Sequence, residues 1–206
     1  MAGYIKYNEN NEVLFSTPKR YNKCLSSQEC ISYLFRPKDY EYQGYLWNKL
    51  FKRYHIADLR FNEDIHFNED RLFIIKYICK EIKRCHYTKS PIYKYYIRPT
   101  GAMESSKGSF NLNFVTDLDA YLLIQEELKK HKSHKNVQFV ERSICYSCYR
   151  IKSMMRKYGI KNTSIECKIA NTLNNHVSLY NEFVFFTIIT YKKIRKQIRA
   201  FIYERN

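Results

Sequence analysis

The pattern of apolar residues changes near Asn113, and this change limits the possible folds more than any other feature of the chain. Before it, short aromatic and β-branched runs are separated by turn signals and interrupted by two helical patterns. After it, helical patterns dominate, in segments at about 116–131, 137–158, 164–174 and 183–203. The sequence therefore predicts an α/β fold, with an α/β region at 1–115 followed by a mainly helical extension at 116–206.

Within the first region, the Asn-rich stretch 8–11 between two β-rich runs predicts a hairpin over 3–16. Ser26 and Glu29 have the spacing of a capping box, which predicts a helix to about Phe35. The remaining expectations are a loop at 17–22, a strand or a helix at 45–52, a short extended run at 61–67, a helix capped by Asn68 to about 82, and a strand at 91–98.

Composition narrows the class of protein. The net charge is +16 with a pI near 9.5, which attracts polyanions such as nucleic acid, anionic lipid and sugar diphosphates without choosing among them. Seven cysteines, an odd number, follow an N-terminus that lacks the apolar core of a secretory signal. A reduced, cytoplasmic protein is expected. No apolar run of about 18 residues exists to span a membrane.

The segment from Gly44 to Phe73 carries the most specific motifs. It reads Gly-Tyr-x-Trp-Asn-Lys-Leu-Phe-Lys-Arg at 44–53, Phe-x-Glu-x-Ile at 61–65 and Glu-Asp-x-x-Phe at 69–73, and Tyr-x-x-Arg follows at 95–98. This ordered set resembles the acceptor-side, C-terminal half of the bacterial family 2 glycosyltransferases of surface-glycan synthesis. The resemblance covers roughly residues 3 to 130.

The resemblance implies a partial GT-A sandwich and an inverting sugar transfer from a nucleotide-sugar to a glycan or lipid-linked acceptor in polysaccharide biosynthesis. Such a displacement needs a base on the acceptor hydroxyl. By resemblance the catalytic base is Asp70, with Glu69 beside it. Trp47 is the expected sugar-stacking ring. Asn48, Lys49 and Arg98 are the expected contacts to acceptor or diphosphate.

Each of these residues also has an ordinary interpretation. Glu69 and Asp70 are acidic residues in a first helical turn, where the helix dipole favours a carboxylate whatever its role. Trp47 is equally well explained as a core or rim aromatic that binds no sugar, and Lys49 as a solvated lysine. Arg98 is followed by Pro99-Thr100-Gly101-Ala102, which departs from the family's commoner polar run.

The family also needs a nucleotide-binding half that ends in an Asp-x-Asp holding a divalent cation, Mn or Mg. Asp117-Leu118-Asp119 spells this motif but is predicted to open a helix, so helix capping is the preferred explanation. The expectation is therefore half an enzyme, inactive alone, which an N-terminal half or a catalytic subunit completes. Cys145 and Cys148 form a CxxC without a second ligand pair, and two ordinary helical cysteines are expected.

The tail suggests peripheral membrane contact. An apolar stretch at 183–189 precedes five basic residues between 192 and 199, a pattern typical of a helix lying on an anionic bilayer at the inner face of the plasma membrane. A helix packed on the domain with a solvated basic face is the alternative. Two other functions remain open for the whole chain: a non-catalytic basic protein that binds nucleic acid, and a degenerate transferase acting as a partner subunit.

Overall fold

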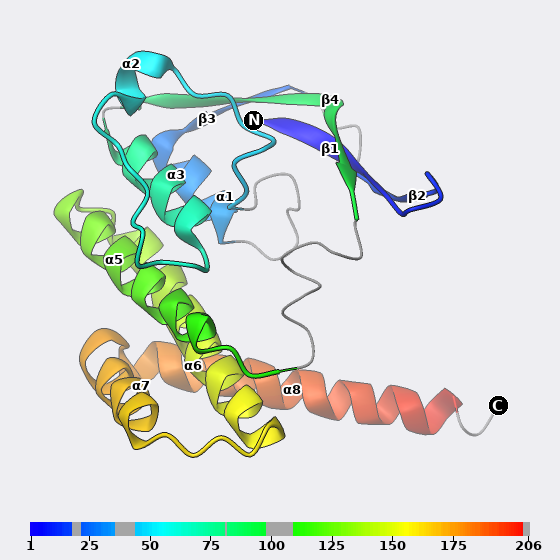
Figure 1. Ribbon diagram of the computed structural model, residues 1–206, viewed down its shortest axis with the longest axis vertical. Helices are drawn as coiled ribbons and strands as arrows, with labels where there is room; N and C mark the ends of the chain where they lie inside the picture. Colours follow the sequence, from blue (N-terminus) through cyan, green and yellow to red (C-terminus); the bar gives the residue numbers. More distant parts are fainter. Residues whose placement is uncertain (18–21, 36–43, 81, 98–108, 204–206) are drawn as a thin grey trace.

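The computed structural model describes residues 1–17, 22–35, 44–80, 82–97 and 109–203, with side chains omitted for Lys89 and 192–203. The chain forms a mixed α/β region followed by a mainly helical region, as the apolar pattern predicts. Figure 1 shows the sheet at one end of the molecule and the long helices at the other.

A four-stranded sheet with the order β2-β1-β4-β3 organises the N-terminal region. β1 (Ala2–Tyr7) pairs antiparallel with β2 (Val13–Ser16) and parallel with β4 (Arg84–Tyr96). β3 (Lys23–Ser26) pairs antiparallel with the first residues of β4. The predicted hairpin is confirmed. β4 is longer than predicted, and β3 was missed because four residues with one buried side chain carry almost no periodic signal.

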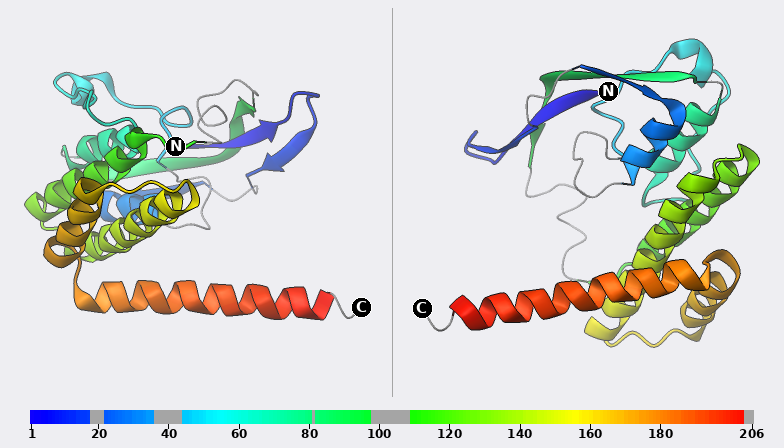
Figure 2. Two further views of the ribbon diagram at one scale, coloured as in Figure 1. Left: turned by 60° about the horizontal axis from the view of Figure 1, so that its bottom comes forward. Right: turned by 180° about the vertical axis from the view of Figure 1, so that it is seen from behind.

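Helices cover one face of the sheet. α1 (Ser27–Leu34) begins with the predicted capping box, in which the Ser26 and Glu29 side chains each accept a backbone N–H of the other residue. α3 (Glu69–Cys79) lies beside α1, and the two form a layer between the sheet and the C-terminal helices (Figures 1 and 2). The segment 44–68 before α3 is irregular except for the short α2 (Arg53–Ile56). The strand or helix expected at 45–52 and the extended run at 61–67 are therefore wrong.

The helical region contains α5 (Thr116–Lys130), α6 (His134–Lys157), α7 (Thr163–His176) and α8 (Leu179–Tyr203), and the short 3-10 turn η2 (Leu112–Val115) precedes α5. All four helices were predicted, and Gly159 ends α6 in the left-handed conformation that glycine tolerates best. Within the described residues, no helix has the length and apolarity that crossing a bilayer requires.

The hydrophobic core is continuous across residue 115. One buried cluster joins Leu25 of β3 and Ile75 of α3 to Leu118 of α5 and Ile151 of α6. Polar contacts cross the same junction, because the Ser32 hydroxyl of α1 donates to the Asn136 side chain of α6 at 2.7 Å. The C-terminal helices are thus packed against α1 and α3 and help to fix the position of α3.

Candidate functional site

The structure brings the 44–52 segment against the N-terminal end of α3. Asp70, in the first turn of α3, accepts a hydrogen bond from the backbone N–H of Leu46. Gly44 lies so close to α3 that a Cβ there would sit 2.7 Å from Arg71 Nε and 2.8 Å from Arg71 Cβ. The two parts of the motif, separated by about 20 residues of irregular chain, therefore meet at one place.

Trp47 stands at the centre of an aromatic cluster. Its ring stacks on Tyr45 and Tyr93, with centroids 5.2 and 4.6 Å away, tilts against Tyr95 at 5.3 Å, and meets Tyr4 edge-on at 4.8 Å. Tyr93 and Tyr95 alternate along β4, so they share one face of the strand. The ring of Trp47 is partly buried between the segment and the sheet.

Asn48 fastens the segment to β1. Its backbone carbonyl accepts from Ala2 N at 2.9 Å, and its side-chain amide donates to the Ala2 carbonyl at 3.2 Å. The Asn48 side chain is only 4% exposed. These hydrogen bonds explain why an asparagine stands at this position of the motif, and no bound ligand is needed for the explanation.

Lys49 is partly buried beside the acidic start of α3. Its ammonium donates to the Tyr45 carbonyl at 2.6 Å and to Asn48 Oδ1 at 2.8 Å. Burial lowers the pKa of Lys49 to about 7, although the charges of Cys30 and Asp70 act in the opposite direction. Lys49 is therefore not the fully solvated lysine of the ordinary interpretation. Near pH 7 its amine is divided between charged and neutral forms.

The carboxylates Glu69 and Asp70 are partly buried. Burial raises the pKa of Asp70, and the Leu46 N–H and the Lys49 charge partly offset this effect. Burial also raises the pKa of Glu69, and the neighbouring Asp70 adds to it. Asn68 precedes them in a left-handed conformation with φ 63°, and its side chain makes no capping bond. Asn68 is therefore the N-cap residue of α3, as predicted, but its side chain does not cap the helix.

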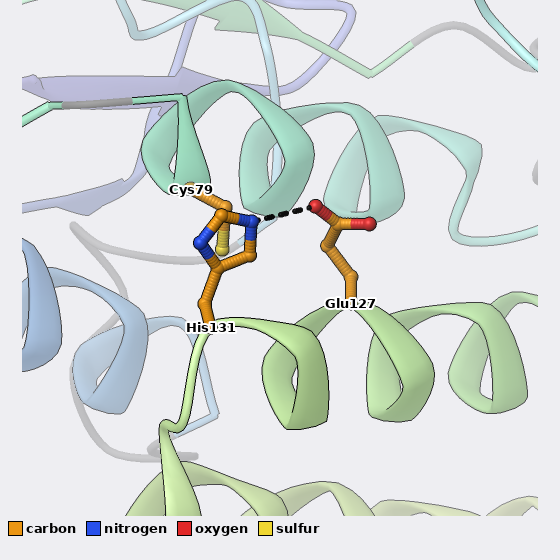
Figure 3. A group of neighbouring side chains, drawn as sticks. All are labelled: Cys79, Glu127 and His131. Atoms are coloured by element: carbon orange, nitrogen blue, oxygen red, sulfur yellow. Dashed lines mark hydrogen bonds and ion pairs between the residues drawn. The ribbon is translucent and has the colours of Figure 1, made fainter.

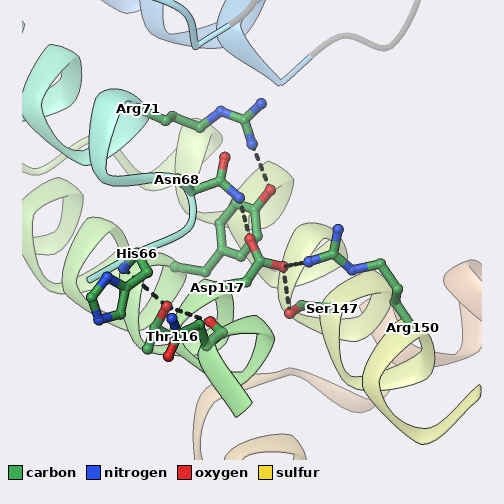
Figure 4. Close-up of polar contacts among 9 residues, drawn as sticks. His66, Asn68, Arg71, Thr116, Asp117, Ser147 and Arg150 are labelled. Atoms are coloured by element: carbon green, nitrogen blue, oxygen red, sulfur yellow. Dashed lines mark hydrogen bonds and ion pairs between the residues drawn. The ribbon is translucent and has the colours of Figure 1, made fainter. Parts of the chain in front are cut away.

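Asn68 is diverted to a buried polar network that Figure 4 shows. Its amide donates to Asp117 at the start of α5, and Asp117 also accepts from Ser147 Oγ at 2.7 Å and from Arg150 Nη2 at 2.9 Å. Asp117 is 2% exposed. The network therefore anchors the residue before Glu69 to α5 and α6.

Arg71, which follows Asp70 in α3, also connects the start of α3 to α5. Its guanidinium donates to the Tyr121 hydroxyl of α5 and lies 5.7 Å from the centroids of both Phe35 and Tyr121. The residues flanking the acidic pair are thus held by the helical region. Neither Arg71 nor Tyr121 was singled out by sequence, because an arginine in a helix has no local mark of a buried partner 50 residues away.

The Asp-x-Asp at 117–119 does not fit a divalent cation. The Asp117 carboxylate is fully engaged by Asn68, Ser147 and Arg150, and the Asp119 carboxylate pairs with Lys168 at 2.6 Å. Protein donors thus supply the positive charge that a metal would bring. The capping role expected for these residues is also wrong, since α5 begins without a side-chain capping bond.

The remaining predicted residues lie apart from this site or outside the described residues. Arg98 falls in the stretch 98–108, which is outside the described part of the chain. Cys145 and Cys148 are buried free thiols in α6, as expected for helical cysteines, and burial raises the pKa of each to about 12. They line a hollow between α6 and α8 together with Tyr149 and Phe186.

Sequence reasoning selected Trp47, Asn48, Lys49, Glu69 and Asp70, and these five residues lie at the junction of the 44–52 segment with α3. It missed the tyrosines that surround Trp47. The alternation of Tyr93 and Tyr95 in a predicted strand was the available signal. Comparison of the chain with protein-family models, with curated proteins and with solved structures found no match.

Proposed function

We propose that this chain is the acceptor-side part of an inverting glycosyltransferase of the family 2 type, with Asp70 as the general base. The supporting observation is the meeting of Asp70, Lys49 and the Trp47 cluster, which come from two segments of the motif and lie against one another. The proposal covers the acceptor side alone. The nucleotide-sugar and its divalent cation would be bound by an N-terminal half or a partner subunit.

In this proposal Asp70 accepts the proton of the acceptor hydroxyl as the oxygen attacks the anomeric carbon of the donor sugar. The bond from that carbon to the diphosphate oxygen breaks, and the nucleoside diphosphate leaves with the electron pair. A base works best when its pKa approaches the working pH, and burial moves the pKa of Asp70 in that direction. The charged form of Lys49 lies near this carboxylate and limits the rise of its pKa.

The aromatic cluster would bind the sugar ring of the acceptor. Rings of Trp and Tyr present flat apolar faces of the kind that pack against the C–H groups of a sugar. Tyr45 is 40% exposed and stacks on Trp47, so the cluster has a solvent-facing edge beside the acidic pair. Two carboxylates next to these rings would repel a phosphate backbone, which makes the nucleic-acid alternative the weaker one.

The test uses the fact that Trp47 is the sole tryptophan of the chain, so its fluorescence reports on this site alone. The full chain is titrated with a panel of neutral oligosaccharides and, separately, with uridine diphosphate and single-stranded DNA. An acceptor site predicts a saturable change of emission with at least one oligosaccharide and a weaker response in Asp70→Asn. The matched control is Asp58→Asn, an exposed acidic residue paired with Lys80.

Two outcomes would contradict the proposal. One is a response to DNA that weakens steeply with salt while no oligosaccharide binds, which would favour the nucleic-acid alternative. The other is oligosaccharide binding that Asp70→Asn and Lys49→Met leave unchanged. A degenerate partner subunit, by contrast, would bind oligosaccharide normally and still give no sugar transfer when combined with a complementary nucleotide-binding half.

A second proposal concerns α8, which would place the enzyme on an anionic membrane surface. One side of its first half packs on α6: the Asn181 amide donates to Glu141 at 2.9 Å, and Phe185 is buried against Tyr149. Large apolar residues elsewhere on the helix are exposed to solvent: Phe183 is 70% and Tyr191 62% exposed, and Phe186, at the edge of the hollow beside α6, is 48% exposed. Figure 2 shows α8 extending beyond the other helices.

The sequence continues this arrangement. The stretch 183–189 is mainly apolar, and five basic residues follow it at 192, 193, 195, 196 and 199. A helix that combines exposed apolar residues with a basic segment is typical of the interface of an anionic bilayer. Charge complementarity therefore favours a lipid surface with a lipid-linked acceptor as the occupant of this face.

Flotation of the full chain tests the membrane proposal, with vesicles of phosphatidylcholine alone and of phosphatidylcholine mixed with phosphatidylglycerol. We expect co-flotation with the anionic vesicles only, and its loss in Phe183→Ser/Phe186→Ser. Val13→Ser, which removes an apolar side chain of similar exposure on β2, should float as wild type does. If the protein never floats but forms a dimer that dissociates in Phe183→Ser/Phe186→Ser, this face of α8 instead binds a second copy of the chain.

A further inference from the structure

The C-terminal ends of α3 and α5 carry a group of side chains that the proposed reaction does not use. Cys79 is the last residue of α3, Glu127 lies in the last turn of α5, and His131 follows α5 directly. Their ligand atoms, one sulfur, one oxygen and one nitrogen, all lie within 4.8 Å of one another. Figure 3 shows the three side chains converging between the two helices.

We infer that Cys79, Glu127 and His131 form a binding site for one zinc ion, which clamps the end of α3 to the end of α5. The donor set is a thiolate, a carboxylate and an imidazole, and Zn²⁺ accepts all three in tetrahedral sites. Calcium and magnesium prefer sites made entirely of oxygen and are a poor match. Three protein ligands would leave the fourth position to water, and the 44% exposed His131 side chain gives solvent access to it.

The spacing of the ligands favours a metal. Glu127 and His131 are four residues apart, so they share one face of α5, and His131 Nε2 lies 3.1 Å from Glu127 Oε1. Because Glu127 and His131 are already positioned close together, a three-ligand site needs only one further ligand from a neighbouring element. Cys79 supplies it from α3, a helix that packs along α5.

The electrostatics of the helix ends support the same conclusion. The C-terminal end of a helix carries partial negative charge from its unpaired carbonyl groups, and here two such ends converge. A dication between them would be favoured by both dipoles. The ordinary explanation is a surface Glu–His pair beside an unrelated cysteine. It does not explain why Cys79, from another helix, lies next to this pair.

A zinc clamp would complete the attachment of α3 to α5. The start of α3 is already joined to the start of α5 through Asn68 and Asp117. The two helices therefore run side by side in the same direction, and the metal would fix their far ends. Because Asp70 lies in the first turn of α3, the clamp would also steady the proposed base without touching substrate.

The experiment titrates the full chain, stripped with a chelator and kept reduced by a phosphine, with Co²⁺ as a spectroscopic substitute for zinc. We expect one equivalent to produce a thiolate-to-cobalt charge-transfer band and the visible bands of a tetrahedral ion, and Zn²⁺ to displace it. Cys79→Ser should abolish the charge-transfer band. His131→Gln removes a ligand, so it should weaken binding at least as much as the loss of an outer-shell partner does, about 10- to 100-fold.

Matched controls use other cysteines of the chain. Cys167→Ser changes an exposed thiol and should bind the metal as wild type does. Cys148→Ser tests the CxxC of α6 as a rival site. Circular dichroism checks folding, and His131→Gln alters a half-exposed side chain, so at least one variant should remain folded. Absence of the band in the wild-type chain, or a band lost in Cys148→Ser but kept in Cys79→Ser, would overturn the inference.

Discussion

Two acidic pairs open helices in this protein, Glu69 with Asp70 at α3 and Asp117 with Asp119 at α5, and their surroundings are opposite. Asp117 is buried among three donors, Asn68 at the start of α3 and Ser147 and Arg150 on α6. Asp70 is only partly buried, and it interacts with one backbone N–H and with the nearby charge of Lys49. Acidic residues are thus favoured locally in a first helical turn, but the elements packed around the turn decide what each carboxylate interacts with.

The difference separates a structural carboxylate from one suited to chemistry. The Asp117 carboxylate accepts hydrogen bonds from Asn68, Ser147 and Arg150, so it is not available to bind a ligand. Asp70 has its pKa raised by burial and retains capacity to accept a proton. The variants that follow test this contrast, beginning with the largest expected effect.

Asp117→Asn should strongly destabilise the protein. The amide offers a single acceptor oxygen to three donors and leaves Arg150 without its ion-pair partner. We expect a loss of about 3 kcal/mol in the free energy of unfolding, measured by urea denaturation. Asp119→Asn is the matched control, since its pair with Lys168 is partly exposed and should contribute under about 1 kcal/mol. An equal loss of unfolding free energy in the two variants would show that Asp117 is no more important to stability than the partly exposed Asp119.

Lys49→Met should change the dependence of stability on pH. The pKa of Lys49 is lowered to about 7 in the folded chain, whereas an unfolded lysine titrates near 10.4. Between these values the unfolded chain binds more protons, so this group makes the wild type more stable as pH rises. Below pH 7 the full cost of the buried charge is present.

The Met variant should therefore gain on the wild type at low pH. From pH 9 to pH 6 we expect its unfolding free energy to rise relative to wild type by on the order of 2 kcal/mol. Urea denaturation at pH 6, 7.5 and 9 measures the difference. Lys80→Met alters an exposed lysine paired with Asp58 and should show no such trend. A flat difference for Lys49→Met would mean that Lys49 is not buried beside Asp70.

Gly44→Ala should disturb the contact between the 44–52 segment and α3. The added Cβ would lie 2.7 Å from Arg71 Nε, so the segment or Arg71 must shift, at a cost of about 1 kcal/mol or more. Trp47, three residues on, should report the shift as a change of emission. Gly159→Ala also costs stability, because its φ is positive, but it meets no neighbour and should leave the emission of Trp47 unchanged.

Asp70→Asn should have the smallest effect on stability, under about 1 kcal/mol at pH 7. The folded pKa of Asp70 is raised, so any stability it contributes is present at low pH and is lost as pH rises through the folded value. The variant should therefore gain on the wild type when denaturation is repeated from pH 3 to pH 7. A loss as large as that of Asp117→Asn would show that Asp70 is another structural carboxylate.

The fold was predictable wherever the signal was local. Ser26 and Glu29 identified the start of α1, the Asn-rich turn identified the β1–β2 hairpin, and the apolar period identified α5 to α8. β3 and the irregular 44–68 segment were not predictable in the same way. Their conformations depend on pairing with β4 and on contacts with α3 and β1, and these neighbours are distant in sequence.

The sequence by itself determined the mixed α/β order and the approximate positions of the hairpin and of most helices, since propensity and periodicity act between near neighbours. The tertiary structure alone decided how each charge is used. It diverted Asn68 from capping to Asp117, buried Lys49 beside Asp70, and brought Cys79 to Glu127 and His131. Burial and charge pairing depend on which distant segments pack together, and that information lies in the folded chain.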